Sequence, residues 1–134
     1  MKQREIINNY GPIPENIRTA LAKALIKAAA EIKSITIIVP DFSTIEGVIT
    51  ETYGKDFIKS VKNETPITFS GVSIKINIVS ERTMSSSKVG DIALCIYVTA
   101  KILEKINDFY KVKDEIVVPW MEEDIQLYKK TWKL

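Results

Sequence analysis

Apolar residues recur at helical spacing in three stretches of the chain. The first stretch, 14–32, begins at a proline and carries an apolar stripe at spacings of three and four, which predicts an amphipathic helix. The second follows Thr99, a residue suited to cap a helix. The third begins near Met121, with carboxylates in its first turn and lysines in its last, as the helix dipole favours.

Short apolar runs between these helices predict strands. Residues 35–39, 91–98 and 116–118 are almost continuously apolar, which is typical of strands buried on both faces of a parallel sheet. Residues 63–79 favour β structure with a hairpin turn at Ser70-Gly71, and alternation over 74–79 places that strand near a sheet edge. Residues 43–62 predict an interrupted helix, broken at Gly54.

Helices and strands therefore alternate along most of the chain. This order predicts an α/β fold: a compact, Rossmann-like domain with a mostly parallel sheet of four or five strands flanked by helices. We expect one domain over residues 1–134, with 1–13 as a lead-in and 111–115 as a charged turn. The step from Val79 to Asp91 is too short for a helical crossover, so an antiparallel pairing of strands 74–79 and 91–98 is one alternative.

Composition narrows the chemistry that the chain could perform. It has no histidine, so a Ser-His-Asp triad, a Cys-His pair and histidine-containing metal sites are excluded. Its single cysteine, Cys95, lies in an apolar run and is expected to be buried. Neither a G-x-G-x-x-G nor a P-loop motif is present. We therefore expect a non-catalytic protein with no cofactor and no metal.

Charge and hydropathy give expectations about location and partners. The formal net charge of +2 gives no reason to expect a nucleic-acid partner. No apolar stretch approaches the roughly 20 residues of a membrane span, and the first ten residues lack the apolar centre of a signal peptide. The expected location is the cytoplasm, without a membrane partner.

The carboxyl ends of the predicted strands carry the candidate binding residues. In open parallel sheets, ligands bind outside these ends. The 80–88 loop is rich in hydroxyls and also carries a guanidinium and an ammonium group, which suits a small anionic ligand, although a solvated connection explains it equally. The candidate ligand-binding residues are Ser80, Arg82, Thr83, Lys88, Thr99 and Trp120. Asp41 and Glu81 are the candidates for acid–base or metal chemistry.

Two functions follow from these patterns. The first is a non-catalytic binding or interaction module that forms a homo-oligomer or binds a protein partner, with Trp120, Tyr128 and Trp132 at the interface. The second is a small protein that binds or hydrolyses a nucleotide or another phosphate-bearing ligand at the carboxyl ends of the strands. The missing catalytic motifs favour the first.

Overall fold

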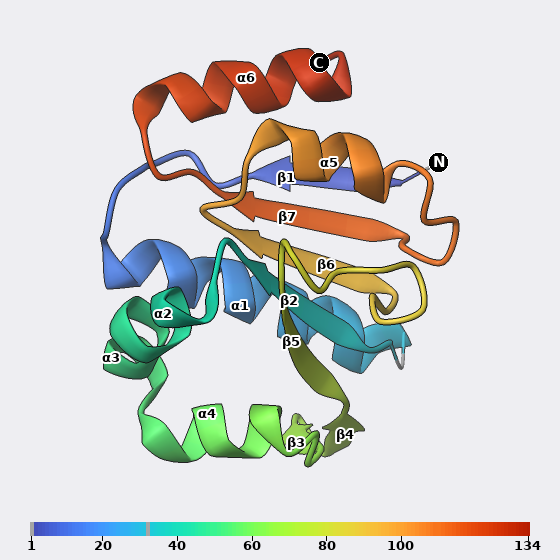
Figure 1. Cartoon of the computed structure of the whole chain (residues 1–134). Coiled ribbons are helices and arrows are strands. Elements are labelled where there is room, and N and C mark those ends of the chain that lie inside the picture. The colour runs from blue at the N-terminus through green and yellow to red at the C-terminus, as the bar shows by residue number, and fades with distance from the viewer. Residues whose placement is uncertain (1, 32) are drawn as a thin grey trace.

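A five-stranded parallel sheet forms the centre of the molecule in this computed structural model (Figure 1). The structure describes the backbone of residues 2–31 and 33–134, and their side chains apart from 44–46. Met1 of the predicted lead-in and Ile32 at the end of the first predicted helix lie outside the described residues. The strands are β1 (Gln3–Ile6), β2 (Ile35–Val39), β5 (Ile76–Ser80), β6 (Ile92–Ile96) and β7 (Asp114–Val118). Their spatial order is β1-β7-β6-β2-β5, and every neighbouring pair is parallel, so the predicted α/β class is confirmed.

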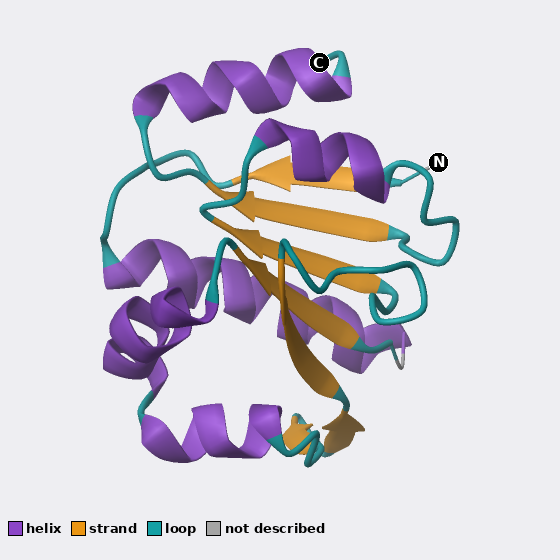
Figure 2. Cartoon of the chain, viewed as in Figure 1, coloured by secondary structure: helices purple, strands orange, loops and turns teal. Residues whose placement is uncertain are grey.

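Helices cover both faces of this sheet (Figures 1 and 2). Helix α1 (Pro14–Glu31) lies on one face, and α5 (Ala100–Ile106) and α6 (Glu122–Trp132) lie on the other. Because successive strand residues point to opposite faces, each strand contributes to two cores. Ile37 and Leu94 pack on the α1 side, whereas Ile38 and Cys95 pack on the α5–α6 side.

The segment between β2 and β5 consists of short helical pieces and a hairpin. It contains α2 (Phe42–Thr44), the π-helix η1 (Ile45–Ile49), α3 (Thr50–Tyr53), α4 (Lys55–Lys62), β3 (Ile67–Phe69) and β4 (Val72–Ile74). Gly54 ends α3 with a φ of 86°, which confirms the predicted break. Strands β3 and β4 pair antiparallel around the predicted turn, apart from the main sheet (Figure 2). No helix in the described part of the chain has the length and apolarity that crossing a membrane requires.

The predicted lead-in is wrong in one respect, because residues 3–6 form strand β1. This strand pairs in parallel with β7 at the edge of the sheet, from Gln3 opposite Asp114 to Ile6 opposite Val117. An edge strand needs a partner on one side only, so β1 forms from a polar sequence without an apolar run of its own. The pairing comes from a strand about a hundred residues away, which no local pattern indicates.

The antiparallel alternative for the strands at 74–79 and 91–98 is also wrong. Strand β5 lies at the sheet edge, as predicted, but β2 separates it from β6 and all three run parallel. Residues 81–91 cross one face through two turns and no helix. Eleven residues could span up to roughly 36 Å if fully extended, so the segment is long enough to make the crossing even with these turns. Within this segment, Met84 and Val89 are buried against the sheet and cover the face that a crossover helix would otherwise cover.

The predicted charged turn at 111–115 is shorter than expected, because β7 includes Asp114 and Glu115. Both carboxylates are buried, at 4% and 1% exposure. Asp114 accepts hydrogen bonds from Lys27 (3.2 Å) and Lys33 (3.1 Å), and Glu115 forms an ion pair with Arg4. Distant cations thus make a charged sequence compatible with a buried strand.

Gly90 is required where the chain enters β6. A Cβ atom at this position would lie 2.1 Å from Oγ of Ser34, so the hydroxyl would have to leave its hydrogen bonds with Asp91. We expect Gly90→Ala to lower the free energy of unfolding by about 1–2 kcal/mol, measured by urea titration.

Two further variants identify the cause of that loss. Gly47→Ala is the matched control, because open space surrounds Gly47, and we expect no loss of stability. In a Ser34→Ala background, Gly90→Ala should cost clearly less than in the parent, since the 2.1 Å contact is gone. Equal costs in both backgrounds would show that the Ser34 hydroxyl is not the obstacle.

Candidate functional site

The parallel sheet brings all five strand ends to one edge, which we call the carboxyl edge. Strand β2 leads through α2–α4 to β5, whereas its neighbour β6 leads through α5, on the opposite face, to β7 (Figure 1). The chain therefore leaves β2 and β6 in opposite directions. In open α/β sheets such a switch point opens a crevice in which ligands bind.

A hollow of about 360 Å³ lies at this switch point. We call it the carboxyl-edge hollow. The segment after β2 contributes Pro40, Asp41 and Ser43, the π-helix contributes Gly47 and Val48, and the segments after β6 and β7 contribute Tyr97 and Trp120. Its volume is within the range of small-molecule sites. Single-turn π-helical segments also occur frequently at functional sites.

Two aromatic rings form one wall of the carboxyl-edge hollow. The rings of Tyr97 and Trp120 meet edge to face, with centroids 4.9 Å apart. Tyr97 donates a hydrogen bond from its hydroxyl to the carbonyl of Gly11 (3.1 Å), and burial raises the pKa of its phenol. Its backbone has a φ of 59°, a left-handed conformation that is an outlier for a bulky residue. Trp120 remains 44% exposed, so the wall offers an open indole held by a fixed ring.

The polar side of the hollow is acidic. Asp41 accepts hydrogen bonds from the backbone N–H (2.9 Å) and the hydroxyl of Ser43, which orient the carboxylate at the start of α2. No lysine or arginine is among the described residues that line the hollow. Aromatic faces beside a carboxylate suit a planar group that is neutral or positively charged, and they disfavour an anion.

The predicted ligand residues Ser80 and Thr83 hydrogen-bond to each other. Their hydroxyl oxygens lie 3.1 Å apart, the Ser80 N–H donates to the Thr83 hydroxyl (3.1 Å), and the Thr83 N–H donates to the Ser80 hydroxyl (3.3 Å). Ser80 is only 4% exposed. These contacts stabilise the turn after β5, which accounts for both residues without a ligand.

The candidate carboxylates Asp41 and Glu81 line different hollows, one beside the π-helix and the other beside α5. Glu81 accepts a hydrogen bond from the Thr99 hydroxyl (3.0 Å). Thr99 occupies the cap position of α5 as predicted, but its side chain makes no capping bond because it binds Glu81 instead. Arg82 lines the same hollow beside α5 as Glu81. The other charged residues there are Lys101, Lys105, Glu104 and Asp108, which makes three cations and three carboxylates among the described lining residues.

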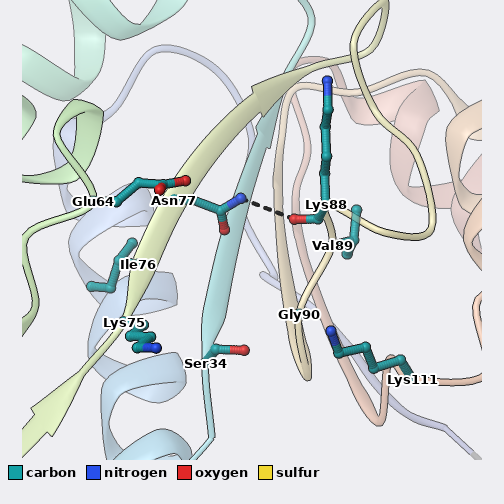
Figure 3. Close-up of a pocket in the computed structure, with 9 residues that line it drawn as sticks. All are labelled: Ser34, Glu64, Lys75, Ile76, Asn77, Lys88, Val89, Gly90 and Lys111. Atoms are coloured by element: carbon teal, nitrogen blue, oxygen red, sulfur yellow. Dashed lines mark hydrogen bonds between the residues drawn. The ribbon is translucent and has the colours of Figure 1, made fainter.

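Lys88 lies at the opposite edge of the sheet from Ser80 and Arg82. The 81–91 segment begins at the carboxyl end of β5 and ends at the amino end of β6, so it carries Lys88 across the face. There Lys88 lines a separate hollow with Ser34 and Gly90 (Figure 3). The predicted cluster of anion-binding residues on this loop is therefore divided between two edges.

Two of the three predicted interface residues belong to the core. Tyr128 is 1% exposed and Trp132 is 4% exposed, and both pack on the α5–α6 side of the sheet. The apolar stripe predicted for this helix is real, but it contacts the sheet of the same chain. Of the three, Trp120 alone is exposed. Other exposed apolar side chains lie on segments that follow strands at the carboxyl edge: Met121, Phe42, Tyr10 and Ile13.

The sequence patterns missed several residues of the carboxyl-edge hollow, among them Tyr97, Gly47 and Val48. Tyr97 falls inside the predicted strand 91–98, whereas β6 ends one residue before it. An aromatic residue at the end of an apolar run was the only local signal. The contribution of Gly47 and Val48 depends on how α2 and η1 pack, which periodicity does not show.

Comparisons with known proteins add no assignment. No family model matches the chain, and neither the curated proteins nor the solved structures yield a significant match. Function is therefore argued from the site alone.

Proposed function

We propose that this protein is a non-catalytic binding module that holds a planar, neutral or positively charged group of a partner in the carboxyl-edge hollow. The observation that carries this proposal is the open indole of Trp120, braced by Tyr97 beside the carboxylate of Asp41 at the switch point of the sheet. The exposed apolar side chains around it supply the wider contact surface that a protein partner needs.

The chemistry of the hollow defines the group that it accepts. A guanidinium or an aromatic ring gains from stacking on Trp120, and a positive charge on or beside that planar group gains further from Asp41. A phosphate would meet a carboxylate with no lysine or arginine among the described lining residues. An arginine or aromatic side chain of a partner therefore fits better than an anionic ligand.

Replacing Trp120 by Ala should reduce binding of such groups at least tenfold, which corresponds to about 1.4 kcal/mol. The probes are a short arginine peptide and phenethylammonium. Each is titrated into the protein, and binding is followed by the change in tryptophan fluorescence. A Trp132→Phe background leaves Trp120 as the only tryptophan in the sequence. The substitution is mild because the buried Nε1 of Trp132 has no hydrogen-bond partner among the residues that the structure describes. Binding by the Trp120→Ala variant is followed by calorimetry.

Two variants control this experiment. Tyr110→Ala removes another exposed aromatic ring, which follows α5 at the far end of the sheet, and should leave binding unchanged. Asp41→Asn should weaken both cations more than a neutral aromatic probe such as phenethyl alcohol. No saturable response in the parent, or equal binding by Trp120→Ala, would refute the proposal. Tighter binding of the peptide than of phenethylammonium would identify a protein partner as the natural source.

A nucleotide or phosphate-bearing ligand at the carboxyl ends of the strands stays an untested prediction. The hollow beside Arg82 offers three cationic and three acidic side chains, so it has no excess of positive charge. Ser80 and Thr83 are engaged with each other. We therefore place this alternative second.

A further inference from the structure

A second hollow, of about 260 Å³, lies at the opposite edge of the sheet, where the strands begin. We call it the amino-edge hollow. Four separate segments bring polar residues to it: Ser34 before β2, Lys75 before β5, Lys88 and Gly90 before β6, and Lys111 before β7 (Figure 3). A group at this position contacts parts of the chain that are distant in sequence.

The lysines of the amino-edge hollow have no carboxylate partner among the described residues. Lys27 and Lys33 lie near the same edge, but both are paired with Asp114. Lys75, Lys88 and Lys111 form no ion pair within the described part of the chain. Among the described residues that line the hollow, these three lysines face one carboxylate, Glu64, so positive charge is in excess. A concave site with one excess sign of charge attracts ions of the other sign.

Two of the three lysine side chains that line the hollow extend toward Ser34 (Figure 3). In Figure 3 the ammonium groups of Lys75 and Lys111 extend from opposite sides toward the hydroxyl of Ser34, whereas the ammonium of Lys88 points away. Asn77 donates a hydrogen bond to the Lys88 carbonyl (2.9 Å), which fixes the upper wall. Ser34 lies directly against Gly90, where a Cβ atom would come within 2.1 Å of the Ser34 hydroxyl oxygen.

We infer that the amino-edge hollow binds a small oxyanion of the phosphate class, held between Lys75 and Lys111. Two ammonium groups suit an anion with more than one negative charge. The space equals that of several water molecules at about 30 Å³ each, so it admits an inorganic phosphate or a terminal phosphate group. This inference is independent of the function proposed for the carboxyl-edge hollow.

The test is a calorimetric titration of the full chain with inorganic phosphate and with pyrophosphate at low ionic strength. We expect saturable binding of both, tighter for pyrophosphate. The double variant Lys75→Gln/Lys111→Gln should bind at least tenfold more weakly. The control Lys129→Gln/Lys130→Gln removes the same charge from the exposed end of α6 and should bind like the parent.

A substitution with the opposite effect makes the test sharper. Glu64→Gln removes the one carboxylate that the structure describes in the lining and should strengthen phosphate binding several-fold. All substituted residues are exposed, so the fold should persist, which circular dichroism checks. Equal losses in the two lysine pairs would overturn the inference in favour of an adventitious ion only, and so would weaker binding by Glu64→Gln. The Trp120→Ala variant should bind phosphate like the parent, which separates the two sites.

Discussion

Replacing Arg4 by Met should lower the free energy of unfolding by about 3 kcal/mol, at the low end of the range for breaking a buried ion pair. Arg4 donates from Nε to Glu115 (2.8 Å), whose side chain is fully buried. The guanidinium is partly exposed, which moderates the effect. Without Arg4, the carboxylate of Glu115 keeps its desolvation cost and loses its ion-pair partner.

The loss of Arg4 removes other contacts as well. Its guanidinium donates to Asn107 and lies over the ring of Trp132, 5.6 Å from the ring centroid. Strand β1, the turn after α5 and the end of α6 thus meet at this one side chain. Denaturant unfolding measures the total effect, and hydrogen exchange of the β1 amides shows whether the edge strand opens first.

The pH dependence of the stability loss in Arg4→Met distinguishes the effect of the unpaired Glu115 charge from the effect of lost packing contacts. Burial raises the pKa of Glu115 above its ordinary value, although the hydrogen bond and charge of Arg4 oppose that rise. A carboxyl with a raised folded-state pKa favours folding most at low pH, and this contribution is lost as the pH rises through that pKa. Arg4→Met should raise the pKa further, so its deficit should shrink from neutral to mildly acidic pH.

Two further variants control the Arg4 experiment. Adding Glu115→Gln to Arg4→Met should recover part of the lost stability at neutral pH, because the unpaired charge is gone. Arg4→Lys keeps a positive charge and should cost less than Arg4→Met. A deficit for Arg4→Met below about 1 kcal/mol, or one that is independent of pH, would show that the ion pair does not stabilise the fold.

Tyr128→Ala should cost about 3–5 kcal/mol, as expected for a large aromatic side chain removed from a core. The Tyr128 side chain is 1% exposed, and its hydroxyl donates to the carbonyl of Val98 (2.5 Å) just after β6. This contact fastens α6 to the carboxyl edge beside Tyr97. Tyr128→Phe keeps the ring and loses only the hydrogen bond, so we expect a loss of about 1 kcal/mol.

The neighbouring residue on α6 is the matched control for Tyr128. Leu127 is 49% exposed, and Leu127→Ala should change stability by less than about 0.5 kcal/mol. Thermal or urea unfolding measures all three variants. If Tyr128→Ala were as mild as Leu127→Ala, then α6 would be a detachable element and the original expectation of an interface on this helix would regain support.

The candidate site was only partly predictable from sequence. Asp41 and Trp120 follow buried strands, as the sequence predicts, because the rule for carboxyl ends needs only the strand boundaries. Lys88 was grouped with Arg82 because the two are close in sequence, yet the loop carries them to opposite edges. Lys75 and Lys111 gave no signal, since their meeting depends on the order of the strands.

The sequence by itself determined the α/β class, the apolar runs that become β2 and β6, the break at Gly54 and the buried setting of Cys95. These features depend on spacings of a few residues, which local periodicity records. Only the tertiary structure decided that residues 3–6 form β1, that β6 runs parallel to β2, and that Asp114 and Glu115 are buried. Each of these depends on a partner from a distant part of the chain. Strand pairing and charge neutralisation are long-range interactions, and a one-dimensional pattern does not contain them.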